Sequence, residues 1–105
     1  MPGAHGAGMM RSEKVFYTTN FPGGGTNGLF AIDPRTHRVI GSTNTPIAGP
    51  HNIALTPNGR KLYLTHSGAT ANKVTVYRVS DSNPVPVLLT TIEVGLNPFG
   101  LSFTK

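Results

Sequence analysis

The fold is decided by two segments that match at a shift of 46 positions, Phe16-Tyr17-Thr18-Thr19-Asn20 and Leu62-Tyr63-Leu64-Thr65-His66. Both segments are short and rich in Thr, Tyr and apolar residues, which favours β-strands over helices. A repeat spacing in the 40s, with several short strands in each unit, is typical of units that bury their apolar faces only by stacking on one another. The two segments therefore predict an all-β protein built from two copies of one unit.

Two further pairs of segments repeat with nearly the same spacing. Leu29–Asp33 matches Val74–Arg78 at a shift of 45, and Pro50–Thr56 matches Pro98–Thr104 at a shift of 48. These shifts differ from 46 only by loop-sized amounts. We therefore place the repeats at approximately 14–59 and 60–105.

Turn signals divide the repeats into short strands. Asn and Gly in Pro57-Asn58-Gly59-Arg60 tolerate the positive φ of a tight reversal, and similar chemistry marks Asp33-Pro34 and Asp81-Ser82-Asn83-Pro84. The predicted strands are Lys14–Asn20, Gly28–Asp33, Arg38–Asn44, His51–Thr56, Lys61–His66, Lys73–Val79, Val87–Val94 and Pro98–Thr104. Residues 1–12, rich in Gly, Ala and Met, are interpreted as a disordered leader, and residues 13–105 as the repeat region.

Composition agrees with many short strands and excludes several classes of protein. The chain has 105 residues, 12% of them charged, and its 13 glycines and 9 prolines are spread along the whole length. The absence of cysteine excludes disulfides, thiolate catalysis and a Cys-ligated zinc. No apolar run is long enough for a membrane span, and no secretory signal is recognisable. The net charge of +5 comes from basic residues at predicted turns and strand ends, which indicates a solvated rim rather than a nucleic-acid surface.

These segments resemble the YVTN repeat family, in which a Tyr-Val-Thr-Asn strand is combined with a Val-x-Val-Ile-Asp strand and a Pro-x-Gly-Ile-Ala strand that ends in Pro-Asp-Gly. The chain departs from the pattern at His66, which replaces Asn, at His51-Asn52, which replaces a Gly-containing pair, at Asn58, which replaces Asp, and at Arg78, which replaces the Asp that starts a turn. The resemblance implies a WD40-like β-propeller segment of about two four-stranded antiparallel blades, and an extracytoplasmic location.

The predicted strand order places the blades in offset phase. The chain would begin with the second strand of one blade and stop on the first strand of a third, whereas a closed propeller needs about four to eight blades. The expected partners are therefore other propeller blades or copies of the chain itself. We expect the chain to be a fragment of a larger propeller or a protomer that closes a ring.

The functional expectation is a scaffold that binds a ligand or a protein, without a cofactor. The alternative, implied by the resemblance, is a fragment of a propeller enzyme, either a lactonase-like hydrolase or a metal-dependent reductase of the denitrification type. The sequence favours the scaffold, because its only acids are Glu13, Asp33, Asp81 and Glu93, and no two of them have a catalytic spacing. A Gly-x-Ser-x-Gly nucleophile motif is also missing.

The candidate ligand-binding residues open the predicted innermost strands, which begin at the mouth of a propeller's central channel. They are His51, Asn52, Phe99 and Gly100, and the expected ligand is a protein or a small molecule. His51 and His66 are candidates for a metal site, and the alternative is that they are hydrogen-bonded turn histidines. The sequence leaves open whether these two histidines lie at the same rim.

Overall fold

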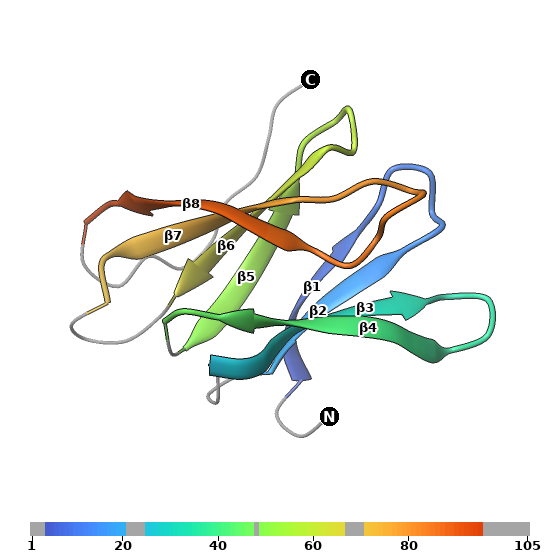
Figure 1. The fold of residues 1–105 in the computed structure, drawn as a ribbon, viewed down its shortest axis with the longest axis horizontal. Helices are drawn as coiled ribbons and strands as arrows, with labels where there is room; N and C mark the ends of the chain where they lie inside the picture. Colours follow the sequence, from blue (N-terminus) through green and yellow to red (C-terminus); the bar gives the residue numbers. More distant parts are fainter. Residues whose placement is uncertain (1–3, 21–24, 48, 67–70, 96–105) are drawn as a thin grey trace.

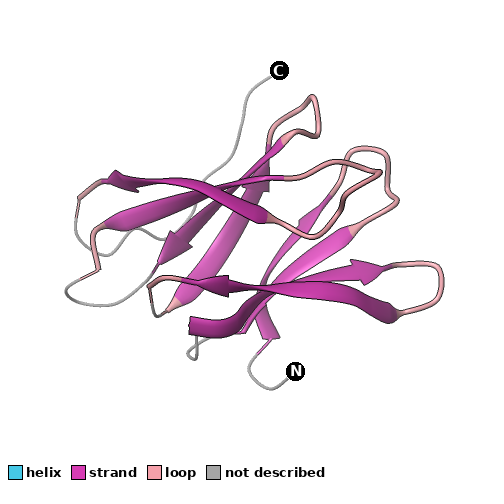
Figure 2. Ribbon diagram, in the orientation of Figure 1, coloured by secondary structure: helices cyan, strands magenta, loops and turns pink. Residues whose placement is uncertain are grey.

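The computed structural model describes residues 4–20, 25–47, 49–66 and 71–95, and the regular elements there are β-strands (Figure 1). The same residues contain no helix that could cross a membrane. Figure 2 shows strands joined by loops and turns, as the repeat pattern predicts. The strands are β1 (Ala4–Met9), β2 (Phe16–Asn20), β3 (Gly25–Asp33), β4 (Arg38–Thr45), β5 (Pro50–Leu55), β6 (Lys61–His66), β7 (Lys73–Arg78) and β8 (Val87–Glu93).

The strands form two antiparallel sheets of four strands each. The order is β1-β2-β3-β4 in the N-terminal sheet and β5-β6-β7-β8 in the C-terminal sheet, so every strand pairs with its neighbour in sequence. This arrangement confirms the predicted pair of four-stranded antiparallel units. Seven of the predicted strands are present with bounds close to those expected, and the eighth, Pro98–Thr104, lies outside the described residues.

The interpretation of residues 1–12 as a disordered leader is wrong for its described part, because residues 4–9 form β1. This strand pairs with β2, with Ala4 opposite Asn20 and Met9 opposite Phe16. Its Gly and Ala residues have low strand propensity, which is why the sequence pattern did not reveal it. Tertiary packing supplies what local propensity lacks.

The glycines of β1 are explained by its close approach to β5. A Cβ atom added to Gly6 would overlap the backbone carbonyl of His51, and one added to Gly8 would lie 2.7 Å from Ile53 Cγ2. Only residues without a side chain fit where these two strands meet. The glycine content that suggested disorder is therefore required by the contact between the two sheets.

Because β1 is the first strand of its sheet, the sheets do not have the offset phase that we expected. Each sheet begins with an edge strand of its own, and β1 and β5 occupy equivalent register positions, Ala4 opposite Asn20 and Pro50 opposite His66. The sequence repeats at 14–59 and 60–105 are therefore out of step with the sheets by one strand.

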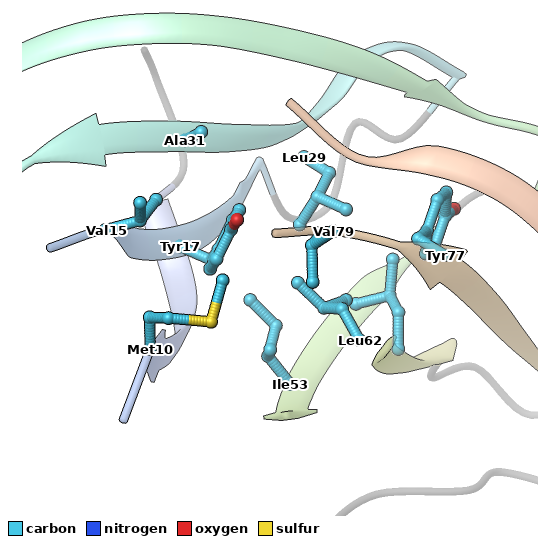
Figure 3. Close-up of a cluster of buried hydrophobic side chains, with 10 residues drawn as sticks. Met10, Val15, Tyr17, Leu29, Ala31, Ile53, Leu62, Tyr77 and Val79 are labelled. Carbon is cyan, nitrogen blue, oxygen red and sulfur yellow. The ribbon is translucent and has the colours of Figure 1, made fainter. Parts of the chain in front are cut away.

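The hydrophobic core lies between the two sheets (Figure 3). Contacts between the sheets are concentrated where β5 meets β1 and β2. The core cluster draws on both sheets and on the segments next to them: Met10, Val15, Tyr17, Leu29, Ala31, Ile53, Leu62, Leu64, Tyr77 and Val79. Burying these side chains provides the main driving force for joining the sheets.

The segment that follows β7 fastens the C-terminal sheet to the N-terminal sheet. Tyr17 donates its hydroxyl hydrogen to the carbonyl of Pro84 (2.6 Å), and Thr43 donates to the carbonyl of Pro86 (2.6 Å). The Ser12 hydroxyl donates to the Asp81 carboxylate (2.7 Å). Burial, reinforced by the charge of Asp81, raises the pKa of the Tyr17 hydroxyl. Tyr17 is therefore protonated at neutral pH and available as a donor.

Candidate functional site

His51 and His66 lie at the same rim of the C-terminal sheet, which answers a question that the sequence left open. The register that places Pro50 opposite His66 brings the start of β5 to the end of β6. Both side chains are buried, and His66 Nε2 is hydrogen-bonded to Thr75 Oγ1 (2.8 Å). His66 is therefore hydrogen-bonded, as in the alternative to a metal ligand, but it ends strand β6 and does not lie in a turn.

The first strands of the two sheets share an irregularity, which in β5 falls at His51 and Asn52, where we expected a ligand to bind. The register of β1 shifts between Ala4 and Ala7, and that of β5 shifts between Pro50 and Ile53. Such a shift leaves an amide outside the regular ladder of hydrogen bonds. In each sheet this amide donates its hydrogen bond to a threonine hydroxyl.

The two threonines are equivalent in the repeat. Thr19 Oγ1 accepts the N–H of Gly6 (2.8 Å), and Thr65 Oγ1 accepts the N–H of Asn52 (3.0 Å). The Thr19 hydroxyl also donates to the carbonyl of His51 (3.3 Å), which links the two sheets. The threonine of the repeated strand motif therefore has a structural role at the start of both innermost strands.

The remaining predicted site residues are only partly described. Asn52 is half-buried at the rim, whereas Phe99 and Gly100 lie outside the described residues. Within the described part of the chain, no group of three or more His, Asp or Glu side chains is placed to hold a metal ion.

The opposite end of the molecule, where the hairpin turns lie, carries a cavity that the sequence did not predict. Its volume is about 630 Å³, within the range of small-molecule sites. It is lined by Arg60, Arg78, Val79, Ser80, Asn83, Val85 and Val87. The departure of Arg78 from the family pattern was the one sequence signal that could have indicated it.

The two arginines of this cavity have no ion-pair partner among the described residues. The ion pairs found there are Arg35 with Asp33 and Lys73 with Glu93. Neither pair reaches the cavity, and no acid lines it. The cavity therefore combines exposed positive charge with an apolar wall.

A smaller cavity of about 340 Å³ adjoins the first and shares Arg60 and Ser80 with it. It lies between the first hairpin turn of the N-terminal sheet and that of the C-terminal sheet. Arg11 and Asp81 also line it. Because Asp81 accepts the hydroxyl of Ser12, its carboxylate is engaged with the N-terminal turn. The charge of this second cavity is therefore mixed, unlike that of the first.

Comparison with known proteins identifies the class of fold. No family model and no curated protein matches the chain. Among solved structures it is similar to Kuenenia stuttgartiensis hydrazine synthase, with a TM-score of 0.76 and 23% sequence identity. The match covers 99% of this chain and 27% of that one, so it includes both sheets but only about a quarter of the other protein. The two sheets are the blades of a β-propeller segment.

Proposed function

We propose that this chain is a binding scaffold that forms part of a larger closed propeller. The observation that carries the proposal is an apolar row across the outer face of the N-terminal sheet. Directly opposite cross-strand partners share a face, and the ladder Met9, Phe16, Ile32 and Val39 crosses all four strands. Met9 and Val39 are 44% and 51% exposed.

The same ladder occurs in the C-terminal sheet, where it is used for stacking. There it consists of Leu55, Leu62, Tyr77 and Leu88. Leu62 and Tyr77 are fully buried in the core between the sheets. Equivalent rows should meet equivalent partners, so the row on the N-terminal sheet supports the stacking of another blade there. That blade would come from a longer chain or from another copy.

The test is the state of association of the chain. We expect size exclusion with light scattering to show association at micromolar concentration, because both ends of the stack leave apolar surface open. Met9→Lys combined with Val39→Lys should shift the chain towards monomer. The control is Thr36→Lys combined with Ser82→Lys, which adds the same charge at exposed residues in loops between strands.

Two outcomes would contradict stacking through this face. One is a stable, cooperative monomer for the unaltered chain at micromolar concentration. The other is equal dissociation in the control variant, which would assign the effect to the added charge instead of to this face.

We further infer that the repeat is of the YVTN type. The paired threonines support this, because Thr19 and Thr65 hold equivalent amides in the two blades. The starts of the innermost strands, His51 with Asn52 and Phe99 with Gly100, are a proposed contact site for a ligand or a partner protein. His51→Ala combined with Asn52→Ala should weaken such binding without preventing folding, as measured by ligand titration and urea unfolding.

The alternative function, a segment of a propeller enzyme such as a lactonase-like hydrolase or a metal-dependent reductase, draws support from the name of the similar structure, hydrazine synthase. The chain corresponds to only 27% of that protein's length. The coding sequence on both sides decides between the two functions. Further blades joined to a haem or copper motif would favour the enzyme, and blades alone would favour the scaffold.

A further inference from the structure

We propose that the cavity at the turn end of the C-terminal sheet binds a small organic anion, in which a carboxylate or phosphate group is attached to a compact apolar body. The proposal rests on the binding-scaffold function and names a ligand class for it. Arg60 and Arg78 would hold the anionic group, and the valines of the cavity would contact the apolar body.

Three basic residues lie close together along the backbone at this corner, and two of them line the cavity. The N–H of Val79 donates to the carbonyl of Arg60 (3.0 Å), which fixes Arg60 beside the end of β7. Lys61 is the direct cross-strand partner of Arg78. Like charges placed opposite one another in a sheet are unfavourable, and no described acid forms an ion pair with these residues. An anion bound at this corner would relieve the repulsion.

The blade architecture does not require this concentration of charge. The equivalent corner of the N-terminal sheet has Lys14, Val15 and Asp33, which is one cation, one apolar residue and one acid. The carboxylate of Asp33 accepts the backbone N–H of Arg35 (2.9 Å), which lowers its pKa and stabilises the turn. With Arg78 in place of an acid, the C-terminal sheet lacks this turn contact and gains a cation that lines the cavity.

The rest of the cavity is suited to a ligand that is only partly polar. Val79, Val85 and Val87 form its apolar wall. Val85 is held against the neighbouring sheet, since a Cβ atom added to Gly41 would lie 2.6 Å from Val85 Cγ2. The contact between the blades therefore positions this part of the wall before any ligand binds.

Two polar residues that line the cavity, Ser80 and Asn83, are hydrogen-bonded to each other. The Ser80 hydroxyl accepts the N–H of Asn83 (2.9 Å), and the N–H of Ser80 donates to the carbonyl of Asn83 (3.2 Å). This small loop holds the segment after β7 in one conformation. Arginine suits the proposed anionic group because its planar fork of donors matches both carboxylate and phosphate oxygens.

The experiment is calorimetric titration of the whole chain at low salt with four probes: phenyl phosphate, benzoate, inorganic phosphate and benzyl alcohol. We expect phenyl phosphate or benzoate to bind more tightly than the other two, and the preferred one identifies the anionic group. Arg60→Ala and Arg78→Ala should each weaken that binding about tenfold, the effect of losing one charged hydrogen bond. Arg38→Ala is the matched control, because it removes the same charge from the turn end of the other sheet and should leave binding unchanged.

Three results would overturn the proposal. Benzyl alcohol that binds as tightly as benzoate would remove the role of the arginines, and inorganic phosphate that binds as tightly as phenyl phosphate would remove the role of the valines. An equal loss in Arg38→Ala would reduce the effect to general attraction by the net charge of +5. Circular dichroism confirms that each variant is folded. Light scattering on the same samples reports blade stacking separately, so failure of anion binding is distinguishable from failure of the scaffold function.

Discussion

The first hairpin turn of each sheet has the same backbone geometry but a different residue at its most demanding position. In residues 10–15 and 56–61, the first residue donates its N–H to the carbonyl of the last at 2.9 Å in both cases. The fourth residue has a positive φ in each turn, 63° for Glu13 and 71° for Gly59. Glycine adopts this conformation without strain, whereas glutamate does not. The blade architecture therefore determines the geometry of this turn. The local sequence changes only its conformational energy.

The innermost strands also differ at one position. There it is the N-terminal sheet that has the glycine. Gly6 and Asn52 occupy equivalent positions, and the amide of each is bound by a threonine hydroxyl. Gly6 lies against the backbone of the next blade, whereas Asn52 carries a half-buried side chain. Blade equivalence thus constrains the backbone, and the neighbouring blade decides which side chains fit on it.

The largest effect is expected from Gly6→Ala, which tests whether β1 really lies against β5. The new Cβ would overlap the backbone carbonyl of His51. A change of side-chain rotamer cannot relieve this clash, because neither atom moves with a rotamer. We expect a loss of about 3 kcal/mol in the free energy of unfolding, measured in urea. Gly95→Ala is the control, because nothing lies within 4 Å of the added atom. A neutral Gly6→Ala would remove β1 from the interface and restore the interpretation of this segment as a leader.

A smaller effect should separate the two threonines. Thr19→Val leaves the buried amide of Gly6 without an acceptor and removes the link to His51, so we expect a loss of about 2 kcal/mol. Thr65→Val affects an amide that is only partly buried and contacts within one sheet, and should cost about 1 kcal/mol. Urea unfolding of both variants measures the difference. Equal losses would mean that the link between the sheets contributes nothing.

The smallest effect concerns the two turns. Glu13→Gly should stabilise the chain by about 0.5 kcal/mol, because relief of the positive φ outweighs the added freedom of the unfolded chain. Gly59→Ala should destabilise it by about 1 kcal/mol, since it introduces the strain that Glu13 already has. Thermal unfolding of both variants against the unaltered chain is the measurement. Destabilisation by Glu13→Gly would show that the glutamate side chain makes a contribution larger than its strain.

Most of the strands could be predicted from the sequence because they carry their own signals. Leu62-Tyr63-Leu64 and Pro57-Asn58-Gly59 specify a strand and a turn by local propensity, and the structure places both as expected. β1 could not be predicted in this way, because Gly6 and Gly8 are explained only by contacts with β5, more than 40 residues later in the sequence. A local sequence pattern does not reveal a strand whose residues are determined by contacts with another blade.

The candidate site was predicted less completely than the fold. The shared rim of His51 and His66 follows from the strand register, which the sequence alone did not fix. The cavity at the other end depends on how the segment after β7 folds back towards Arg60, a long-range contact with no sequence signature. Arg78 was noticed as a departure from the family pattern, but its meaning required the position of Arg60.

The fastening of the N-terminal sheet by the segment after β7 has a consequence for synthesis. Tyr17 reaches its acceptor Pro84 across 67 residues of chain, and Ser12 reaches Asp81 across 69. At a translation rate of about 5–20 residues per second, these partners emerge roughly 3 to 14 seconds after the residues that need them. By then β5 and β6 have already emerged and can cover the face of the N-terminal sheet that carries Tyr17 and Leu29. Until residues 81–86 follow, the two sheets are therefore held by their apolar core alone, without the hydrogen bonds that fasten them.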